Sequence, residues 1–159
     1  MKVASAVFLF AVGLLSAIPQ AASAAGAAGP KVAREVFAAA RKDHYDEAER
    51  RALAAKDRLL AKLVRWMAYT KPNANASFAE IGSFIESSPD WPLMSILARR
   101  AEEAITAATP DDQVLAWFRT RRPETVDGAM ALARAQLNAG RRDEAVAVIR
   151  AAWTEGSFG

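Results

Sequence analysis

Three clusters of acidic side chains contain carboxyl groups, the kind of group that enzymes use to cleave glycosidic bonds. A glycosidase needs two carboxyls on opposite sides of a sugar, or one carboxyl whose pKa is raised by an apolar pocket. Neighbouring residues on a helix point about 100° apart, which suits a wet surface or a helix cap better than a shared site. The sequence therefore predicts surface roles and no catalytic pair for all three clusters, which are Asp46, Glu47 and Glu49; Glu102 and Glu103; and Asp111 and Asp112.

His44 is the one histidine of the chain, and there is no cysteine. A metal site would need an all-carboxylate shell around His44, and no spacing of acids indicates one. A Ser-His-Asp arrangement would have to use the same histidine, which lies in the polar turn 42–46 and is predicted to stay at the surface. The glycines are scattered and form no phosphate-binding loop. The sequence thus assigns no catalytic, cofactor-binding or metal-ligating residue, and no cofactor.

Four tryptophans are candidates for stacking on sugars. Three of them, Trp66, Trp117 and Trp153, have the spacing of helix packing faces, so we expect them to pack between helices. Trp91 lies between two prolines at a corner of the chain and is predicted to plug that corner.

A basic stripe, formed by Arg58, Lys62 and Arg65, has the i, i+4, i+7 spacing of one helix face. Such a stripe could bind the carboxylates of peptide stems. The same pattern is typical of a solvated helix face, which is the interpretation that we prefer.

The beginning of the chain is typical of an export signal. A charged start, an uncharged apolar run over 3–18 and the small residues 22–24 follow one another in the required order. We expect a signal peptide over 1–24, a flexible linker over 25–30 and a periplasmic location without a membrane anchor. The alternative, an uncleaved anchor, is disfavoured because the apolar run is shorter than the roughly 20 residues of a spanning helix. The chain has 21 basic and 18 acidic residues in a mixed pattern, so no nucleic-acid partner is expected.

Helical periodicity is nearly continuous, and no segment alternates like a strand for more than a few residues. One buried face is predicted for Ala145, Val148, Ile149, Ala152 and Trp153. About eight helices are expected, near 31 to 42, 45 to 55, 57 to 70, 78 to 87, 92 to 108, 110 to 120, 125 to 139 and 142 to 154. Paired in order they make four helical hairpins. The predicted domain, 31–159, is all-α, with an α-solenoid or stacked helical hairpins of the superhelical repeat type, and is expected to be incomplete; a closed orthogonal bundle is the alternative.

Capping and turn residues mark the helix boundaries. Ser77 and Glu80 have the spacing of a capping box, so a helix should begin directly after Ser77. Pro92 fits the first position of the next helix, because its fixed φ and missing N–H are tolerated there. Further boundaries are predicted at Thr109 and Thr125 as caps, at Pro110 as a first helical residue, and at Gly140 and Gly156 as helix-closing glycines.

Several short segments stand in a specific order along the chain. They are Lys56-Asp57, Lys62–Trp66, Ser77–Ile81, Phe84-Ile85, Pro89–Pro92, Arg99–Glu102, Ala116–Phe118 and Leu132–Ala135. In this order the chain resembles the amino-terminal superhelical region of soluble lytic murein transglycosylases, over most of the part that follows the signal. The resemblance implies a curved or ring-shaped array around the path of a glycan strand, with peptidoglycan glycan strands as the partner.

In that family a separate carboxy-terminal lysozyme-like domain cleaves between N-acetylmuramic acid and N-acetylglucosamine and forms a 1,6-anhydro product, using one glutamic acid. The signature of that domain does not occur here, since Glu86-Ser87 is not followed by Gly-Leu-Met-Gln. The resemblance therefore implies a substrate-positioning scaffold that is inactive by itself. The alternative function is a stand-alone periplasmic helical-repeat module that binds a protein partner.

Overall fold

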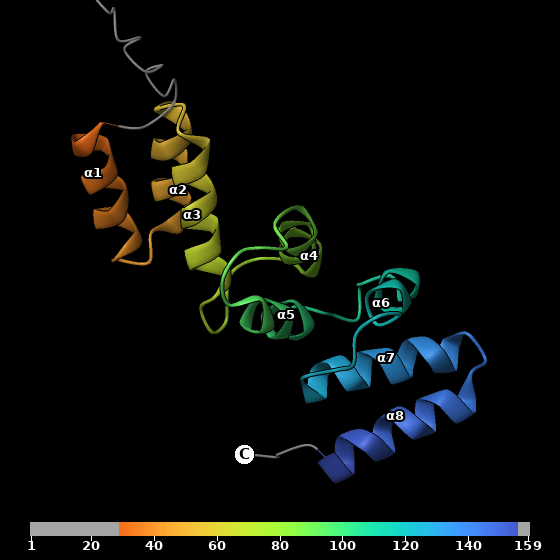
Figure 1. Ribbon diagram of the computed structural model, residues 1–159. Coiled ribbons are helices and arrows are strands. Elements are labelled where there is room, and N and C mark those ends of the chain that lie inside the picture. The colour runs from red at the N-terminus through yellow and green to blue at the C-terminus, as the bar shows by residue number, and fades with distance from the viewer. Residues whose placement is uncertain (1–28, 156–159) are drawn as a thin grey trace, which may run out of the picture.

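The computed structural model describes residues 29–155, and every regular element in this range is a helix (Figure 1). The helices are α1 (Pro30–Ala40), α2 (Tyr45–Ala54), α3 (Arg58–Tyr69), α4 (Phe78–Ser87), α5 (Met94–Glu103), α6 (Asp111–Trp117), α7 (Val126–Asn138) and α8 (Arg142–Glu155). The predicted all-α class and the number of helices are confirmed. The predicted signal peptide, most of the linker and Gly156 lie outside the described residues.

Local capping signals gave three boundaries correctly. Helix α4 follows Ser77, whose hydroxyl accepts a hydrogen bond from the Glu80 N–H while the Glu80 carboxylate accepts one from the Ser77 N–H. Thr125 caps α7 through the Gly128 N–H. Gly140 follows the end of α7 with a φ of 76°, a conformation that glycine adopts without a Cβ clash.

The prediction that Pro92 begins a helix is wrong. Helix α5 begins at Met94, after Leu93, which has a left-handed φ of 62°. The Pro92 carbonyl accepts a hydrogen bond from Trp66 Nε1 at 2.9 Å. Because that carbonyl binds an indole on α3, residue 92 stays in the corner instead of entering the first turn of α5.

Helices α5 and α6 are both shorter than predicted. Helix α5 ends at Glu103 because the chain enters a turn in which the Thr109 hydroxyl accepts a hydrogen bond from the Thr106 N–H at 3.0 Å. Thr109 therefore does not cap α6. Pro110 occupies that capping position, and the helix runs only from Asp111 to Trp117.

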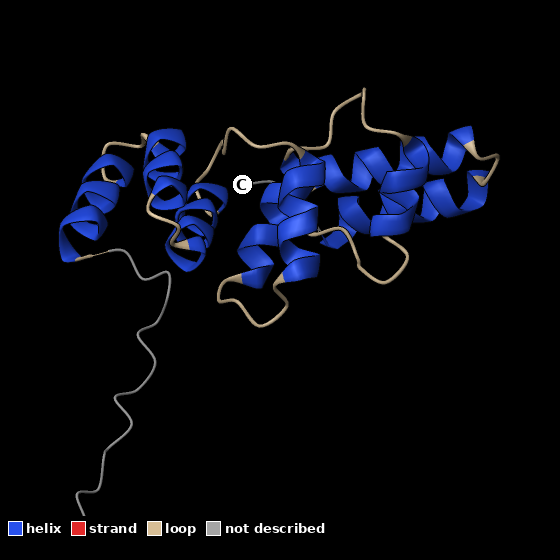
Figure 2. Ribbon diagram, turned by 90° about the horizontal axis from the view of Figure 1, so that it is seen from above, coloured by secondary structure: helices blue, strands red, loops and turns tan. Residues whose placement is uncertain are grey.

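Two of the four predicted hairpins, α1–α2 and α7–α8, are present within residues 29–155, whereas the other two are not. Helix α2 packs on both α1 and α3, α4 packs on α5, and α7 packs on both α6 and α8. The predicted α3–α4 and α5–α6 hairpins are absent from the extensive helix contacts of the described chain. Figure 1 shows the three groups following one another along the length of the molecule, and Figure 2 shows from above that α1–α3 stand apart from the remaining helices.

Two hydrophobic clusters hold these groups together. The alanine-rich cluster lies within α1–α3 and consists of Val36, Ala39, Ala40, Ala48, Ala52, Leu60, Ala61 and Val64. Alanine lets these helices approach closely. The aromatic cluster spans α4–α7 and consists of Phe78, Ile81, Phe84, Ile85, Leu97, Ala101, Val114, Trp117, Phe118, Ala131, Leu132 and Ala135. Trp66 and Tyr69, at the end of α3, pack against the aromatic cluster and so connect the two.

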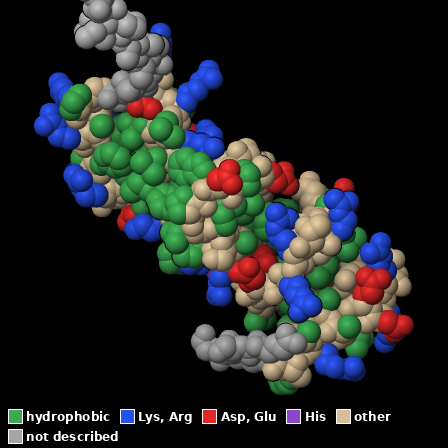
Figure 3. Space-filling model, viewed as in Figure 1, with side chains coloured by type: hydrophobic (Ala, Val, Ile, Leu, Met, Phe, Trp, Pro, Cys, Tyr) green, Lys and Arg blue, Asp and Glu red, His purple; other side chains and the backbone are tan. Residues whose placement is uncertain are grey.

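On the face shown in Figure 3, the surface differs between the two halves of the molecule. In the space-filling view, hydrophobic side chains gather over α1–α3 with Lys and Arg around them, whereas acidic and basic side chains alternate over the second half (Figure 3). Exposed large apolar side chains occur in both halves: Leu53 and Leu59 lie in the first, and the second contains Leu93, Val126, Met130, Leu137, Val146, Ile149 and Trp153.

Candidate functional site

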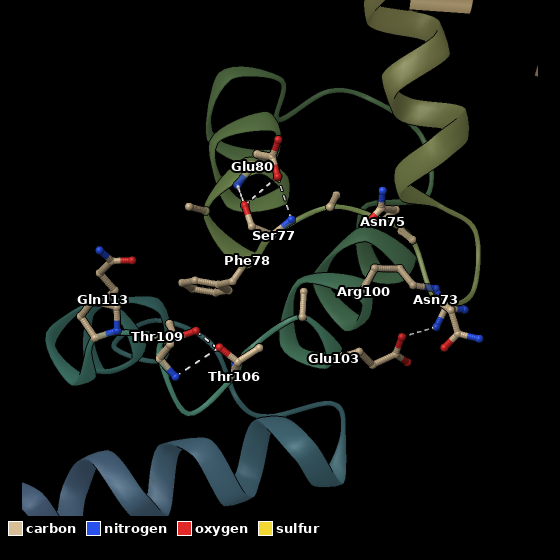
Figure 4. Close-up of a pocket in the computed structure, with 16 residues that line it drawn as sticks. Asn73, Asn75, Ser77, Phe78, Glu80, Arg100, Glu103, Thr106, Thr109 and Gln113 are labelled. Carbon is tan, nitrogen blue, oxygen red and sulfur yellow. Dashed lines mark hydrogen bonds and ion pairs between the residues drawn. The ribbon is translucent and has the colours of Figure 1, made fainter. Parts of the chain in front are cut away.

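A polar groove lies between the α3–α4 connection, the start of α4, the end of α5 and the start of α6 (Figure 4). Its cavity has a volume of about 600 Å³. The lining consists of Asn73, Ala74, Asn75, Ala76, Ser77, Phe78, Ala79, Glu80, Arg100, Glu103, Ala104, Thr106, Ala108, Thr109, Pro110 and Gln113. Most of the polar groups in this lining are neutral amides and hydroxyls.

The capping box of α4 fixes one wall of the polar groove. The Ser77 N–H and hydroxyl both donate to Glu80 Oε2, at 2.8 and 2.7 Å, and the Glu80 N–H donates to Ser77 Oγ at 3.2 Å. These donated bonds lower the pKa of the Glu80 carboxyl below its ordinary value. Glu80 therefore presents a fixed carboxylate rather than a group that exchanges protons near neutral pH.

The opposite wall is held by a threonine turn and an ion pair. The Ala108 N–H donates to the Thr106 hydroxyl at 3.3 Å, next to the bond between Thr106 and Thr109. Arg100 forms an ion pair with Glu103 one turn further along α5. Figure 4 shows both pairs at the edge of the cavity, with the Phe78 ring between the walls. Phe78 is itself largely buried and packs edge-to-face on Trp117, with 5.4 Å between ring centroids.

This arrangement suits binding rather than bond cleavage. Amides and hydroxyls donate and accept hydrogen bonds without changing charge at neutral pH. The two carboxylates in the groove, Glu80 and Glu103, are engaged by Ser77 and Arg100 respectively. A ligand with many neutral hydrogen-bonding groups therefore fits the groove best.

A second, basic groove runs between α2, α3 and α4, with a volume of about 800 Å³. It shares Ala79 and Glu80 with the polar groove, so the two meet along α4. Its lining is Glu49, Leu53, Arg58, Ala61, Lys62, Arg65, Tyr69, Ala79, Glu80, Ser83, Phe84 and Ser87. All three members of the predicted basic stripe line this groove.

The three basic side chains of that stripe have different surroundings. Arg65 forms an ion pair with Glu49 of α2, so its charge is used within the protein. The Lys62 ammonium lies 5.1 Å from the Trp91 ring centroid and 5.7 Å from that of Phe84, within the range of cation–π attraction. Arg58 is exposed in the groove and makes no ion pair within the described residues.

The tryptophans are structural, with one exception. Trp117 is buried in the aromatic cluster, and Trp91 is half-buried between Phe84 and Trp66, at centroid distances of 5.5 and 6.3 Å. The prediction that Trp91 plugs its corner is confirmed. Trp153 was expected to pack between helices, but its side chain is 75% exposed on α8.

The prediction of a surface role for Glu102 is wrong. Only 1% of this residue is exposed, and its carboxylate accepts hydrogen bonds from the chain that leads into α7. Oε2 accepts from the Glu124 N–H, the Thr125 N–H and the Thr125 hydroxyl, at 2.9, 2.9 and 2.8 Å. Burial raises the pKa of the Glu102 carboxyl above its ordinary value, although these bonds act in the opposite direction.

Gly128 makes room for this carboxylate. A Cβ at position 128 would lie 2.4 Å from Glu102 Oε2, closer than nonbonded atoms approach. The sequence contained a signal for this contact. Thr125 and Gly128 occupy the Ser and Glu positions of a capping box, so the N-cap N–H needs a carboxylate from elsewhere. Glu102 is thus occupied in positioning α7 and is not available for acid–base chemistry in a groove.

The other predicted surface residues lie at the surface. His44 precedes α2 with its side chain 61% exposed, beside Glu47. Residues 29–155 contain no group of three His, Asp or Glu side chains that could hold a metal ion. In the same range no helix combines the length and apolar character needed to cross a membrane. The sequence did not identify the lining of the polar groove as a binding site, although Ser77, Glu80, Glu103, Thr109 and Pro110 were considered in other roles; the asparagine-rich connector 72–76 was the available signal.

Comparison with protein-family models, curated proteins and solved structures finds no match to this chain.

Proposed function

We propose that this chain is an exported helical scaffold that holds a segment of a peptidoglycan glycan strand, in the manner of the superhelical region of soluble lytic transglycosylases that its sequence resembles. The observation that carries the proposal is the polar groove. A glycan segment offers hydroxyl and acetamido groups, which match the neutral amides and hydroxyls of Asn73, Asn75, Thr106 and Gln113.

The basic groove extends this assignment. Glycan strands of peptidoglycan carry short peptides with free carboxylates, and such groups would be attracted by Arg58 and Lys62. Because the two grooves meet at Ala79 and Glu80, a sugar in the polar groove would place its peptide near the basic one. The proposal thus assigns the sugar backbone and the peptide stem to adjacent surfaces.

The scaffold performs no cleavage of its own. The acids that line the two grooves are paired with Ser77, Arg100 or Arg65, and Glu102 is bound to the start of α7. We expect the purified protein to release no 1,6-anhydro products from peptidoglycan. A periplasmic location and removal of residues 1–24 are part of the same proposal, which rests there on the signal-like sequence.

Binding to purified peptidoglycan tests the proposal. We expect the protein to cosediment with intact sacculi, and a double substitution, Asn75→Ala with Gln113→Ala, to weaken binding about tenfold through the loss of two hydrogen bonds. Neither side chain makes a hydrogen bond within the described residues, so the fold should persist. A matched control replaces the exposed Ser95 and Thr120, outside the groove, with alanine. Absence of cosedimentation, or equal losses in both double variants, would overturn the assignment.

The second candidate function is a periplasmic module that binds a protein partner. The observation in its favour is the exposed apolar surface of α7 and α8, which includes Met130, Leu137 and Trp153. A stoichiometric partner captured from periplasm, together with no retention on sacculi, would favour this function over glycan binding.

A further inference from the structure

Helix α8 presents an apolar surface away from both hydrophobic clusters. Val146 is 47% exposed, Ile149 is 38% exposed, and Leu137 on the neighbouring α7 is 53% exposed. Together with Trp153 these residues border an open groove of about 380 Å³ between α7 and α8, whose remaining lining is Ala133, Ala145 and Arg150. Figure 1 shows α7 and α8 side by side at one end of the array, with α8 outermost.

Four of the exposed residues of α8 form one continuous seam. Arg142, Val146, Ile149 and Trp153 follow at intervals of four, three and four, which is the spacing of the a and d positions in a helix pair. Ala145 lies to one side of this seam and is buried against α7. On the opposite side, Asp143 and Arg150 lie seven residues apart and therefore face the same way.

The charged side chains beside the seam can form ion pairs with the same side chains of a second copy. Within the described chain neither Asp143 nor Arg150 forms an ion pair, and both are exposed. In an antiparallel pair of α8 helices these flanking positions face each other, so Asp143 of each copy would meet Arg150 of the other. Val146 would likewise pack on Ile149 of the second copy, and Arg142 would lie near Trp153 of the second copy.

A parallel arrangement lacks these features. It would bring the two Arg142 side chains together in the seam. It would also leave Asp143 and Arg150 facing the side of the second helix that carries Ala145. Like charges at such contacts are unfavourable. The pattern of charge therefore selects the antiparallel, two-fold symmetric pairing.

We propose that the α7–α8 surface binds a second copy of this chain, forming a two-fold dimer in which the α8 helices pair antiparallel and α7 flanks them on each side. The interface is isologous, since each copy contributes the same seam and the same two charged residues. It lies apart from the polar and basic grooves, which involve α2–α6, so each copy keeps its grooves open.

Charge reversal tests this pairing through sedimentation equilibrium of the purified protein over a range of concentrations. Wild type is expected to show a concentration-dependent dimer. Asp143→Arg makes both flanking positions basic and Arg150→Asp makes both acidic, so each single variant should raise the dimer dissociation constant about tenfold or more. Both side chains are exposed, so the monomer fold should persist, which circular dichroism checks.

Mixing the two single variants gives the decisive outcome. An equimolar mixture of the two single variants should form a heterodimer, because each basic pair then meets an acidic pair. The double variant, Asp143→Arg with Arg150→Asp, should recover the wild-type dissociation constant. Arg34→Asp, a reversal of an exposed arginine on α1 that forms no ion pair within residues 29–155, is the matched control and should leave dimerisation unchanged.

Three results of the sedimentation measurements would overturn the proposal. They are a wild-type protein that stays monomeric at every concentration tested, a dimer that is indifferent to both reversals, and a mixture of the single variants that stays monomeric. Capture of a different protein by the α7–α8 surface of a monomeric wild type would also contradict it. None of these results bears on binding to sacculi, so the dimer and the glycan-binding proposals fail separately.

Discussion

Helices α4 and α7 begin with the same pair of hydrogen bonds, but the carboxylates that complete them come from different places. In α4 the Ser77 hydroxyl accepts from the third helical residue, Glu80, whose own carboxylate accepts from the Ser77 N–H at 2.8 Å. In α7 the Thr125 hydroxyl accepts from Gly128 at 2.9 Å, and the Thr125 N–H donates to Glu102, 23 residues earlier in the chain.

The helix start of α4 thus depends on a local contact, whereas that of α7 depends on a tertiary contact. The α4 capping box is exposed and uses residues three apart, so it can form as soon as the helix does. The Glu102 contact is buried and requires α5 and α7 to be in place together. Similar hydrogen bonds should therefore have different weights in the free energy of unfolding, because buried donors left without partners are costly.

The largest expected effect is that of removing the buried carboxylate. Glu102→Ala leaves the N–H groups of Glu124 and Thr125 without their acceptor, so we expect a loss of about 3 kcal/mol in the free energy of unfolding. Glu80→Ala removes an exposed capping contact and should cost about 1 kcal/mol. Urea denaturation of both variants measures the difference. Equal losses would show that burial does not distinguish the two helix starts.

A smaller effect of unusual sign is expected at Gly128. Replacing a glycine inside a helix with alanine ordinarily stabilises by about 1 kcal/mol. Gly128→Ala should instead destabilise by about 2 kcal/mol, since the new Cβ would lie 2.4 Å from Glu102 Oε2. Gly82→Ala in α4 is the matched control, because its Cβ would meet Trp117 at an ordinary 3.8 Å and should stabilise. Thermal unfolding of both variants compares the signs; stabilisation by Gly128→Ala would refute the contact.

The smallest effect expected is a difference in pH dependence. The raised pKa of Glu102 means that its titration adds stability below the ordinary value of 4.5, and that this stability is lost as pH rises through the folded-state pKa. The lowered pKa of Glu80 acts the other way, with stability present above 4.5 and lost as pH falls through its folded-state pKa.

Conservative variants resolve these two contributions. Unfolding is measured between pH 3 and pH 7, roughly the range over which carboxyl groups titrate, for wild type, Glu102→Gln and Glu80→Gln. The difference in the free energy of unfolding between wild type and Glu102→Gln should fall as pH rises. The difference between wild type and Glu80→Gln should grow over the same range. Parallel slopes for the two comparisons would contradict the opposite pKa shifts.

The same division between local and tertiary contacts explains what the sequence predicted. The start of α4, the cap at Thr125 and the left-handed Gly140 depend on residues within one turn, and the sequence indicated all three. The start of α5 depends on Trp66, 26 residues before Pro92, and local signals placed it two residues early. The burial of Glu102 likewise depends on a segment that periodicity within α5 does not reveal.

Periodicity also gave an incomplete account of packing. It correctly placed Ala145 against another helix, but it assigned Ile149 and Trp153 to the same buried face, whereas both are exposed. A helical stripe shows which residues share a side and leaves open what covers that side. The polar groove was missed for a related reason, since its walls come from two separate parts of the chain, 73–80 and 100–113.

The aromatic contact at the end of α3 has a consequence for the entropy of binding. Trp66 donates to the Pro92 carbonyl and packs on Trp91, while Tyr69 packs edge-to-face on Phe84, so α3 is held against the α4–α5 pair at several points. Such a joint resists bending between the two halves of the molecule. The basic groove, which spans that joint, is therefore preorganised, and a ligand that enters it gives up less free energy to ordering the protein.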